Sequence, residues 1–82
     1  MRQCQVIVVE DEEIHLRETD IRVIKAFKRN GGQASTRELF YETKMDEAYL
    51  WEKVKYLMEL GLVVRVKRGW YKLTEKGQKV AI

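Results

Sequence analysis

The sequence contains no proline, a single cysteine and no long hydrophobic run. One cysteine cannot form a disulfide within the chain, so Cys4 favours a reducing compartment, which we expect to be the cytoplasm. No segment reaches the roughly 20 apolar residues that a membrane-spanning helix needs, and we expect no association with a membrane. The opening residues, MRQCQVIVVEDEE, pass from a short apolar stretch into acids, which argues against a signal peptide.

The chain also lacks the motifs of common enzymes and of metal sites. It contains no Gly-rich phosphate loop, no HExxH and no CxxC. The single histidine, His15, has no recognisable nucleophile partner, and we predict no catalytic residue and no enzyme. Cys4 and His15 are two ligands where a zinc site needs three or four, so we predict no metal and no cofactor. We expect Cys4 to pack as a small hydrophobic side chain and His15 to lie on a strand surface.

The 82 residues suffice for one small domain, and 45% hydrophobic with 35% charged residues is typical of a folded one. The net charge of +3 is unevenly distributed. Residues 1–20 carry two basic and six acidic side chains, and residues 21–82 carry 14 basic and seven acidic ones. The basic C-terminal part is typical of a domain that binds a polyanion, although a solvated lysine-rich surface would have the same composition.

The N-terminal segment has the pattern of a β-hairpin. Residues 5–9 and 14–16 are short β-branched or extended stretches on either side of four acids at 10–13. We therefore predict two strands with their turn in the acids. Residues 1–18 are expected to be an extension of the main domain, which occupies residues 19–82.

The first helix is predicted to begin near Thr19. The Thr19 hydroxyl is expected to cap it, with Asp20 in the favourable first turn. Apolar residues then recur at helical spacing until Gly31 and Gly32, which can end a helix because glycine tolerates the left-handed conformation.

Two further helices follow in close succession. Ser35 and Glu38 have the spacing of a capping box and predict a helix over 36–43. Asp46 is expected to cap a third helix over 47–60, with apolar residues at i, i+4 and i+7. A turn of about three residues joins the two helices, which is helix-turn-helix geometry.

The C-terminal third of the chain has the pattern of a hairpin and a short helix. Residues 62–66 are rich in β-branched side chains, residues 68–69 are an Arg-Gly turn, and residues 70–73 form the returning strand. Thr74 is expected to cap a last helix that continues to Ile82. The whole order predicts an α+β fold with a three-helix core, a β-hairpin and a short N-terminal β extension.

Three residue strings carry a family resemblance: ASTRELFYET at 34–43; Asp46 followed by Leu50, Val54, Leu57 and Gly61-Leu62-Val63; and YKLTEKG at 71–77. In their order and spacing, residues 19–82 resemble the winged helix-turn-helix DNA-binding regulators of prokaryotes, above all of archaea. The resemblance implies a double-stranded DNA-binding transcriptional regulator. Its helix 47–60 would read the major groove, and its hairpin at 65–70, the wing, would contact backbone or minor groove.

The resemblance also implies which side chains meet the DNA. They come from the second helix, the exposed face of the third helix and the wing: Ser35, Thr36, Arg37, Tyr49, Glu52, Lys53, Tyr56, Arg65, Lys67 and Arg68. One module covers a half-site, so a homodimer on a palindrome is expected. The subunit contact would use either the apolar run Val6–Val9 or the C-terminal helix with Val80 and Ile82.

The third helix departs from the family pattern. Family members usually carry Ser, Thr, Arg, Gln or Asn on this face, whereas residues 46–59 hold four acids against two lysines. Phosphates repel acids. Tyr49, Trp51 and Tyr56 could read bases, pack in the domain or contact a protein, because exposed aromatic side chains are enriched at interfaces. The alternative function is therefore a protein-interaction module that uses this acidic and aromatic helix.

Overall fold

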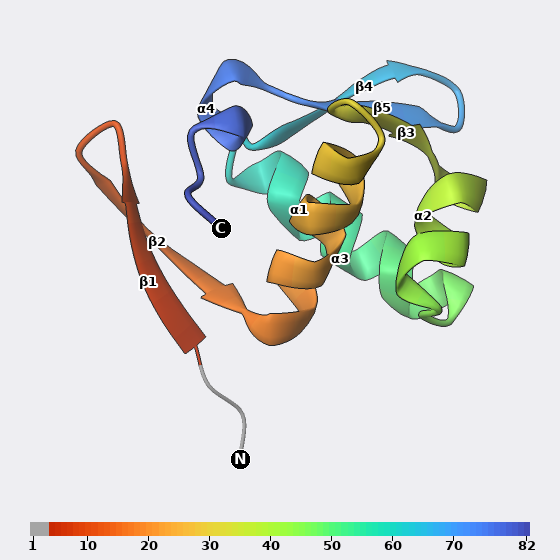
Figure 1. Cartoon of the computed structure of the whole chain (residues 1–82), viewed down its shortest axis with the longest axis horizontal. Helices are drawn as coiled ribbons and strands as arrows, with labels where there is room; N and C mark the ends of the chain where they lie inside the picture. The colour runs from red at the N-terminus through yellow and green to blue at the C-terminus, as the bar shows by residue number, and fades with distance from the viewer. Residues whose placement is uncertain (1–3) are drawn as a thin grey trace.

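A computed structural model describes residues 4–82 as a small mixed α+β domain with four helices and antiparallel strands (Figure 1). Its elements, in chain order, are β1 (Cys4–Val9), β2 (Glu12–Arg17), α1 (Glu18–Arg29), β3 (Gln33–Ser35), α2 (Thr36–Thr43), α3 (Glu47–Glu59), β4 (Val63–Lys67), β5 (Trp70–Leu73) and α4 (Glu75–Gln78).

The N-terminal hairpin forms as the sequence predicts. β1 and β2 are antiparallel, and Val9 pairs with Glu12 across a two-residue loop. Glu10 and Asp11 in that loop both have positive φ, 52° and 68°, which is the conformation of the tight turns that match the twist of a hairpin. Ile14 and other apolar side chains on the inward face of the hairpin are buried.

The prediction that Thr19 caps α1 is wrong. β2 leads directly into α1, and Arg17 is the N-cap residue. The carboxylate of Asp20 caps this end, because its Oδ2 accepts a hydrogen bond from the backbone N–H of Arg17 at 3.0 Å. The hydroxyl of Thr19 has no hydrogen-bond partner in the described part of the chain. α1 then crosses the core, where Phe27 is fully buried.

The capping signals of α2 and α3 are confirmed. The Ser35 hydroxyl accepts from the backbone N–H of Glu38, and the Glu38 carboxylate accepts from the N–H of Ser35. Asp46 accepts from the N–H of Ala48. Residues 44–46 join the two helices.

The C-terminal sheet has the order β3-β5-β4. The short strand β3 places Ala34 beside Tyr71 and Ser35 beside Trp70 of β5. β4 and β5 form the predicted hairpin, with a bulge between Arg65 and Lys67. Tyr71 is buried and Trp70 is half-buried.

α4 is shorter than predicted, since it ends at Gln78 rather than at Ile82. The last residues turn back into the domain instead: Val80 is fully buried, and its carbonyl accepts a hydrogen bond from Lys28 of α1. The chain therefore buries the Val80 side chain in the core instead of extending α4 to Ile82. Gly77 allows α4 to approach the chain closely, because a Cβ at this position would collide with the carbonyl oxygen of Leu62.

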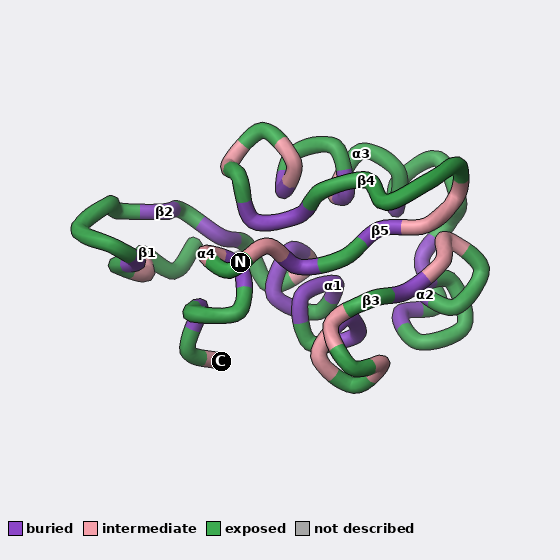
Figure 2. Tube along the Cα trace, turned by 90° about the horizontal axis from the view of Figure 1, so that it is seen from above, coloured by how far each residue is buried: buried purple, intermediate pink, exposed green. Residues whose placement is uncertain are grey.

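The core lies between α1, α3 and the inner faces of the strands (Figure 2). The β1–β2 hairpin lies at one end of the molecule, and α2 with the tip of the β4–β5 hairpin lies at the other (Figure 1). No helix within residues 4–82 combines the length and the apolar character needed to cross a membrane.

Candidate nucleic-acid interface

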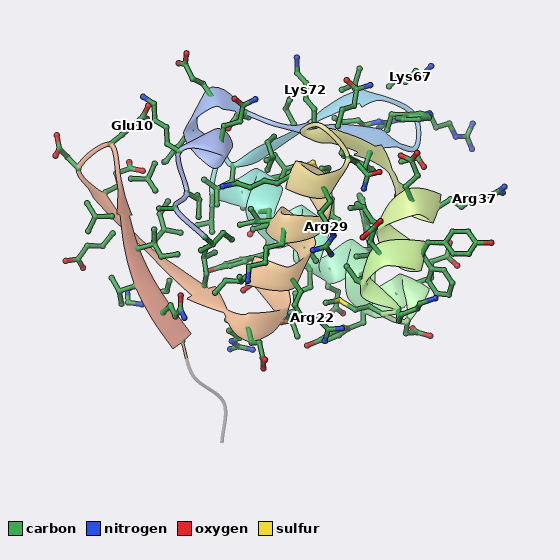
Figure 3. The ribbon with its side chains drawn as sticks, in the orientation of Figure 1. Glu10, Arg22, Arg29, Arg37, Lys67 and Lys72 are labelled. Carbon is green, nitrogen blue, oxygen red and sulfur yellow. The ribbon has the colours of Figure 1, made fainter. Side chains whose placement is uncertain are left out.

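The tip of the β4–β5 hairpin is attached to the start of α2. The backbone N–H of Thr36 donates to the carbonyl of Gly69 at 3.1 Å, directly after the pairing of β3 with β5. Residue Arg37, in the first turn of α2, is exposed and points outward on the same side of the molecule as Lys67 (Figure 3). Two segments that are about thirty residues apart in sequence therefore present their cations together.

Arg65 of β4 lies on the sheet face that meets α3. Cα partners in an antiparallel pair share a face, and Arg65 is the partner of Tyr71. The ring of Tyr71 lies 6.2 Å from the ring of Trp51 on α3, measured between centroids. The β4–β5 hairpin and α3 therefore face the same side, as contact with a single duplex requires.

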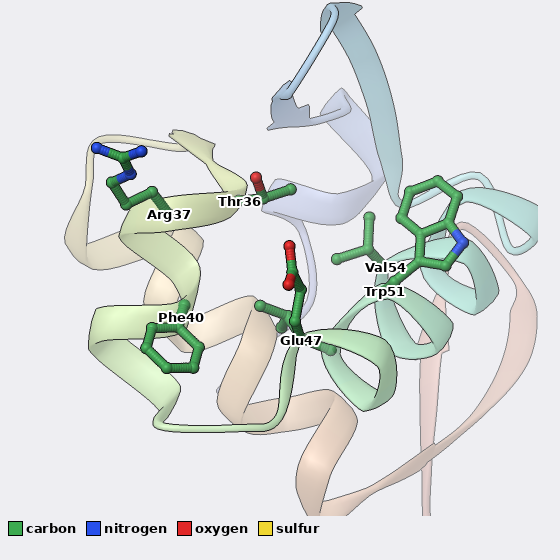
Figure 4. A pocket seen from close by; sticks show the side chains of 7 residues that line it. Thr36, Arg37, Phe40, Glu47, Trp51 and Val54 are labelled. Carbon is green, nitrogen blue, oxygen red and sulfur yellow. The ribbon is translucent and has the colours of Figure 1, made fainter.

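A cavity of about 460 Å³ separates α2 from α3 on this side. Its walls combine apolar and charged side chains: Thr36, Arg37, Phe40, Glu47, Leu50, Trp51 and Val54. The carboxylate of Glu47 points toward Thr36, and Trp51 closes the side nearest the strands (Figure 4). Trp51 and Phe40 are each 45% exposed, so two large apolar side chains reach solvent here.

Of the predicted DNA-binding residues, Thr36 and Arg37 line this cavity, Arg65, Lys67 and Arg68 belong to the β4–β5 hairpin, and Tyr49 lies on another side of α3, where the Lys53 ammonium is 5.0 Å from the centroid of its ring. Arg37, Tyr49, Glu52, Arg65, Lys67 and Arg68 are exposed, and Ser35 and Thr36 are half-buried. The ammonium of Lys67 lies 5.6 Å from the centroid of the Trp70 ring, which is a cation–π contact within the hairpin.

Lys53 and Tyr56 make polar contacts with other elements of the domain, although Tyr56 remains exposed. The Lys53 ammonium lies 3.8 Å from the carboxylate of buried Asp20, and its side chain is only 12% exposed. The Tyr56 hydroxyl donates to the carbonyl of His15 on β2 at 2.9 Å. Both polar groups therefore have partners within the chain, and the DNA contacts expected of these two residues stay predictions.

Sequence reasoning missed Phe40 as a member of this surface. Phe40 follows Leu39 on a short helix, and adjacent helical positions point about 100° apart, so only Leu39 reaches the core. Its exposure could not be read from the sequence, because either residue could have faced inward. The charge of Glu47 was noted, but its position beside Thr36 and Arg37 depends on the packing of α2 on α3.

The remaining predicted features have mixed outcomes. Cys4 is exposed, so its expected packing as a buried hydrophobe is wrong, whereas His15 lies on a strand surface as predicted. Val80 is fully buried and offers no apolar surface to another subunit, whereas Ile82 is half-buried against the core. No group of three or more potential metal ligands occurs within residues 4–82.

The chain matches no family model, and no curated protein matches it. Among solved structures it is similar to BpsR of Bordetella bronchiseptica, whose DNA binding is regulated by 6-hydroxynicotinic acid. The two superpose with a TM-score of 0.65 at 22% sequence identity, over 77% of this chain and 52% of the BpsR chain. The likeness shows a shared fold. The chain spans about half the length of the BpsR chain that it matches.

Proposed function

We propose that this chain is a winged helix-turn-helix protein that binds double-stranded DNA and regulates transcription. α3 would enter the major groove, and the β4–β5 hairpin would act as the wing on backbone or minor groove. The observation that supports this most is the hydrogen bond from Thr36 to Gly69, which places the wing tip beside the start of α2 on the side where Arg65 and α3 also lie.

The electrostatics of this face support a phosphate contact. Arg37, Arg65, Lys67 and Arg68 form no ion pair within residues 4–82, whereas Lys53, Lys76 and Lys79 are each paired with an acid. Unpaired cations on long side chains can neutralise phosphates, and each contact releases condensed counterions. Backbone N–H groups at the start of α2 can add uncharged contacts.

The acids of α3 determine which bases this helix could read. A carboxylate accepts hydrogen bonds, and in the major groove it pairs best with the cytosine amino group. Glu47 and Glu52 are therefore expected to favour C·G pairs, with Tyr49 contributing apolar contact. A single domain would cover one half-site, and two copies would be required for a palindrome.

The test is a titration of a labelled duplex at several salt concentrations. Binding should weaken as salt rises, and Lys67→Ala with Arg68→Ala should reduce the slope of log K against log salt by roughly one unit per cation. Lys76→Ala with Lys79→Ala is the matched control, because it removes the same charge from α4 and its C-cap residue. Affinity that ignores salt, or that survives the loss of Lys67 and Arg68, contradicts the proposal.

The cavity beside Trp51 favours one second candidate, a protein-interaction module. Exposed aromatic side chains around a depression are typical anchors for a partner side chain. This function would be preferred if no duplex bound in the same titration while a partner protein bound the wild-type chain and lost affinity for Trp51→Ala.

A further inference from the structure

The register of the N-terminal hairpin determines where its backbone groups point. In a hairpin closed by a two-residue loop, the pair next to the loop is hydrogen bonded and the bonded pairs then alternate. Val9 and Ile7 therefore bond to β2, whereas the N–H and C=O groups of Val8 and Val6 point away from it. The opposite edge confirms this alternation: His15, the partner of Val6, directs its carbonyl outward, where it accepts from Tyr56.

The outer edge of β1 is consequently unoccupied. The described chain contains no backbone hydrogen bond from another segment to Val6 or Val8. The side chains of these two valines are 52% and 65% exposed on the outward face, while Ile7 and Val9 pack against the domain. A row of free backbone groups thus runs alongside an apolar strip.

β1 has none of the features that protect edge strands from pairing. Charged residues, prolines, bulges and short length all discourage edge-to-edge association. β4, an outer strand of the second sheet, carries Arg65, Lys67 and a bulge between them, and β3 is only three residues long. β1 is six residues long, uncharged and regularly paired.

The edge is also held in a fixed position. Glu10 in the turn pairs with Lys79 at 2.9 Å, and Glu12 pairs with Lys76, so the hairpin is attached to the C-terminal part of the domain. A preformed edge loses little conformational entropy when another strand binds.

We propose that β1 pairs antiparallel with β1 of a second copy of this chain, giving a four-stranded sheet in the order β2-β1-β1-β2. The charges identify the partner. The closed end of each hairpin is acidic at residues 10–13, and the open end carries Arg17 beside Cys4. Antiparallel pairing of two copies places the two acidic turns at opposite ends of the shared sheet, whereas parallel pairing would set them side by side and make them repel each other.

This pairing would leave the DNA-binding face free. The hairpin and Glu10 lie at the opposite end of the molecule from Arg37 and Lys67 (Figure 3). The inference stands on the geometry of β1 alone and does not depend on the proposed function.

Its first test is the molar mass of the full chain in solution, by sedimentation equilibrium. We expect twice the 9.8 kDa of the chain for the wild type, and 9.8 kDa for Val8→Pro. Proline removes an outward N–H and leaves the bonds to β2 intact, and proline is tolerated at such edge positions. Val8→Thr keeps the N–H and should remain dimeric. A monomeric wild type, or a dimeric and folded Val8→Pro, overturns the proposal.

If Val8→Pro does not fold, oxidative cross-linking tests the pairing of the two β1 strands independently. In a Cys4→Ser background, Val6→Cys with Val8→Cys should give a covalent dimer in high yield, because pairing of the strands brings these positions within disulfide range. Val64→Cys with Val66→Cys on β4 is the matched control and should remain monomeric. No dimer from the β1 pair, or equal yields from both pairs, contradicts pairing through β1.

Discussion

At the scale of single residues, the contact between α1 and α3 includes a buried carboxylate. Asp20 is 1% exposed, and one of its oxygens accepts the N–H of Arg17. The other oxygen has no hydrogen bond within the described residues and depends on the ammonium of Lys53. A buried charge is tolerable only while its partner is present.

Lys53→Met should therefore lower the free energy of unfolding by about 3 kcal/mol, because it leaves the Asp20 charge buried without a cation. The measurement is urea denaturation followed by circular dichroism. Lys55→Met removes the same charge from an exposed position of α3 and should change stability by less than about 0.5 kcal/mol. Equal losses for the two variants would show that Lys53 has no structural role.

At the scale of elements, the turn of the N-terminal hairpin and the C-cap residue of α4 form an ion pair that depends on pH. The hydrogen bond and charge of Lys79 lower the pKa of Glu10 below its ordinary value of 4.5, and Glu10 in turn raises the pKa of Lys79 above 10.5. Because the pKa of Glu10 is lowered by folding, its ionised form stabilises the fold above pH 4.5. This stabilisation is lost as pH falls through the pKa that Glu10 has in the folded state. Because the pKa of Lys79 is raised by folding, its protonated form stabilises the fold below pH 10.5. This stabilisation is lost as pH rises through the pKa that Lys79 has in the folded state.

Glu10→Gln should accordingly be less stable than the wild type near neutral pH, and the difference should shrink at both extremes of pH. Urea denaturation at a series of pH values measures it, and added salt should reduce it because both groups are exposed. A difference that remains constant from pH 3 to 11 would mean that the Glu10–Lys79 pair does not contribute.

Local signals in the sequence predicted most elements, and long-range contacts caused the errors. The capping box at Ser35 and the cap at Asp46 involve neighbours in the chain, and both are confirmed. The start of α1 near Thr19 was predicted to within one residue, but its cap was not, because β2 continues directly into the helix and the Asp20 carboxylate accepts from the N–H of Arg17. The pairing of β3 with β5 joins segments that have no local relationship in sequence.

The same distinction applies to the candidate site. Exposed cations such as Arg37 and Arg68 could be predicted from charge and turn position alone. The intramolecular partners of Lys53 and Tyr56 could not be predicted, because Asp20 and the carbonyl of His15 lie more than thirty residues away. The polar group of a side chain that points away from the core can still bind to a neighbouring element of the same domain.

At the scale of the whole molecule, the two proposed surfaces lie at opposite ends of the domain (Figure 1). If both proposals hold, Val8→Pro should bind a duplex with one half-site as tightly as the wild type does. It should lose roughly 100-fold in affinity for a duplex with two half-sites, because linked sites gain effective concentration. Fluorescence anisotropy with both duplexes measures this. Equal losses on the two duplexes would show that β1 acts on DNA binding by another route.

The hydrogen bond between Thr36 and Gly69 has a consequence for which nucleic acid can fit. It attaches the hairpin tip to α2, while Tyr71 of β5 packs against Trp51 of α3, so the hairpin cations and α3 cannot adjust independently to a nucleic acid of another shape. The major groove of B-form DNA admits an α-helix, whereas that of A-form RNA is too deep and narrow for side chains to read. If α3 reads a groove as proposed, double-stranded RNA would meet the β4–β5 hairpin without the helix, and would bind weakly and without sequence preference.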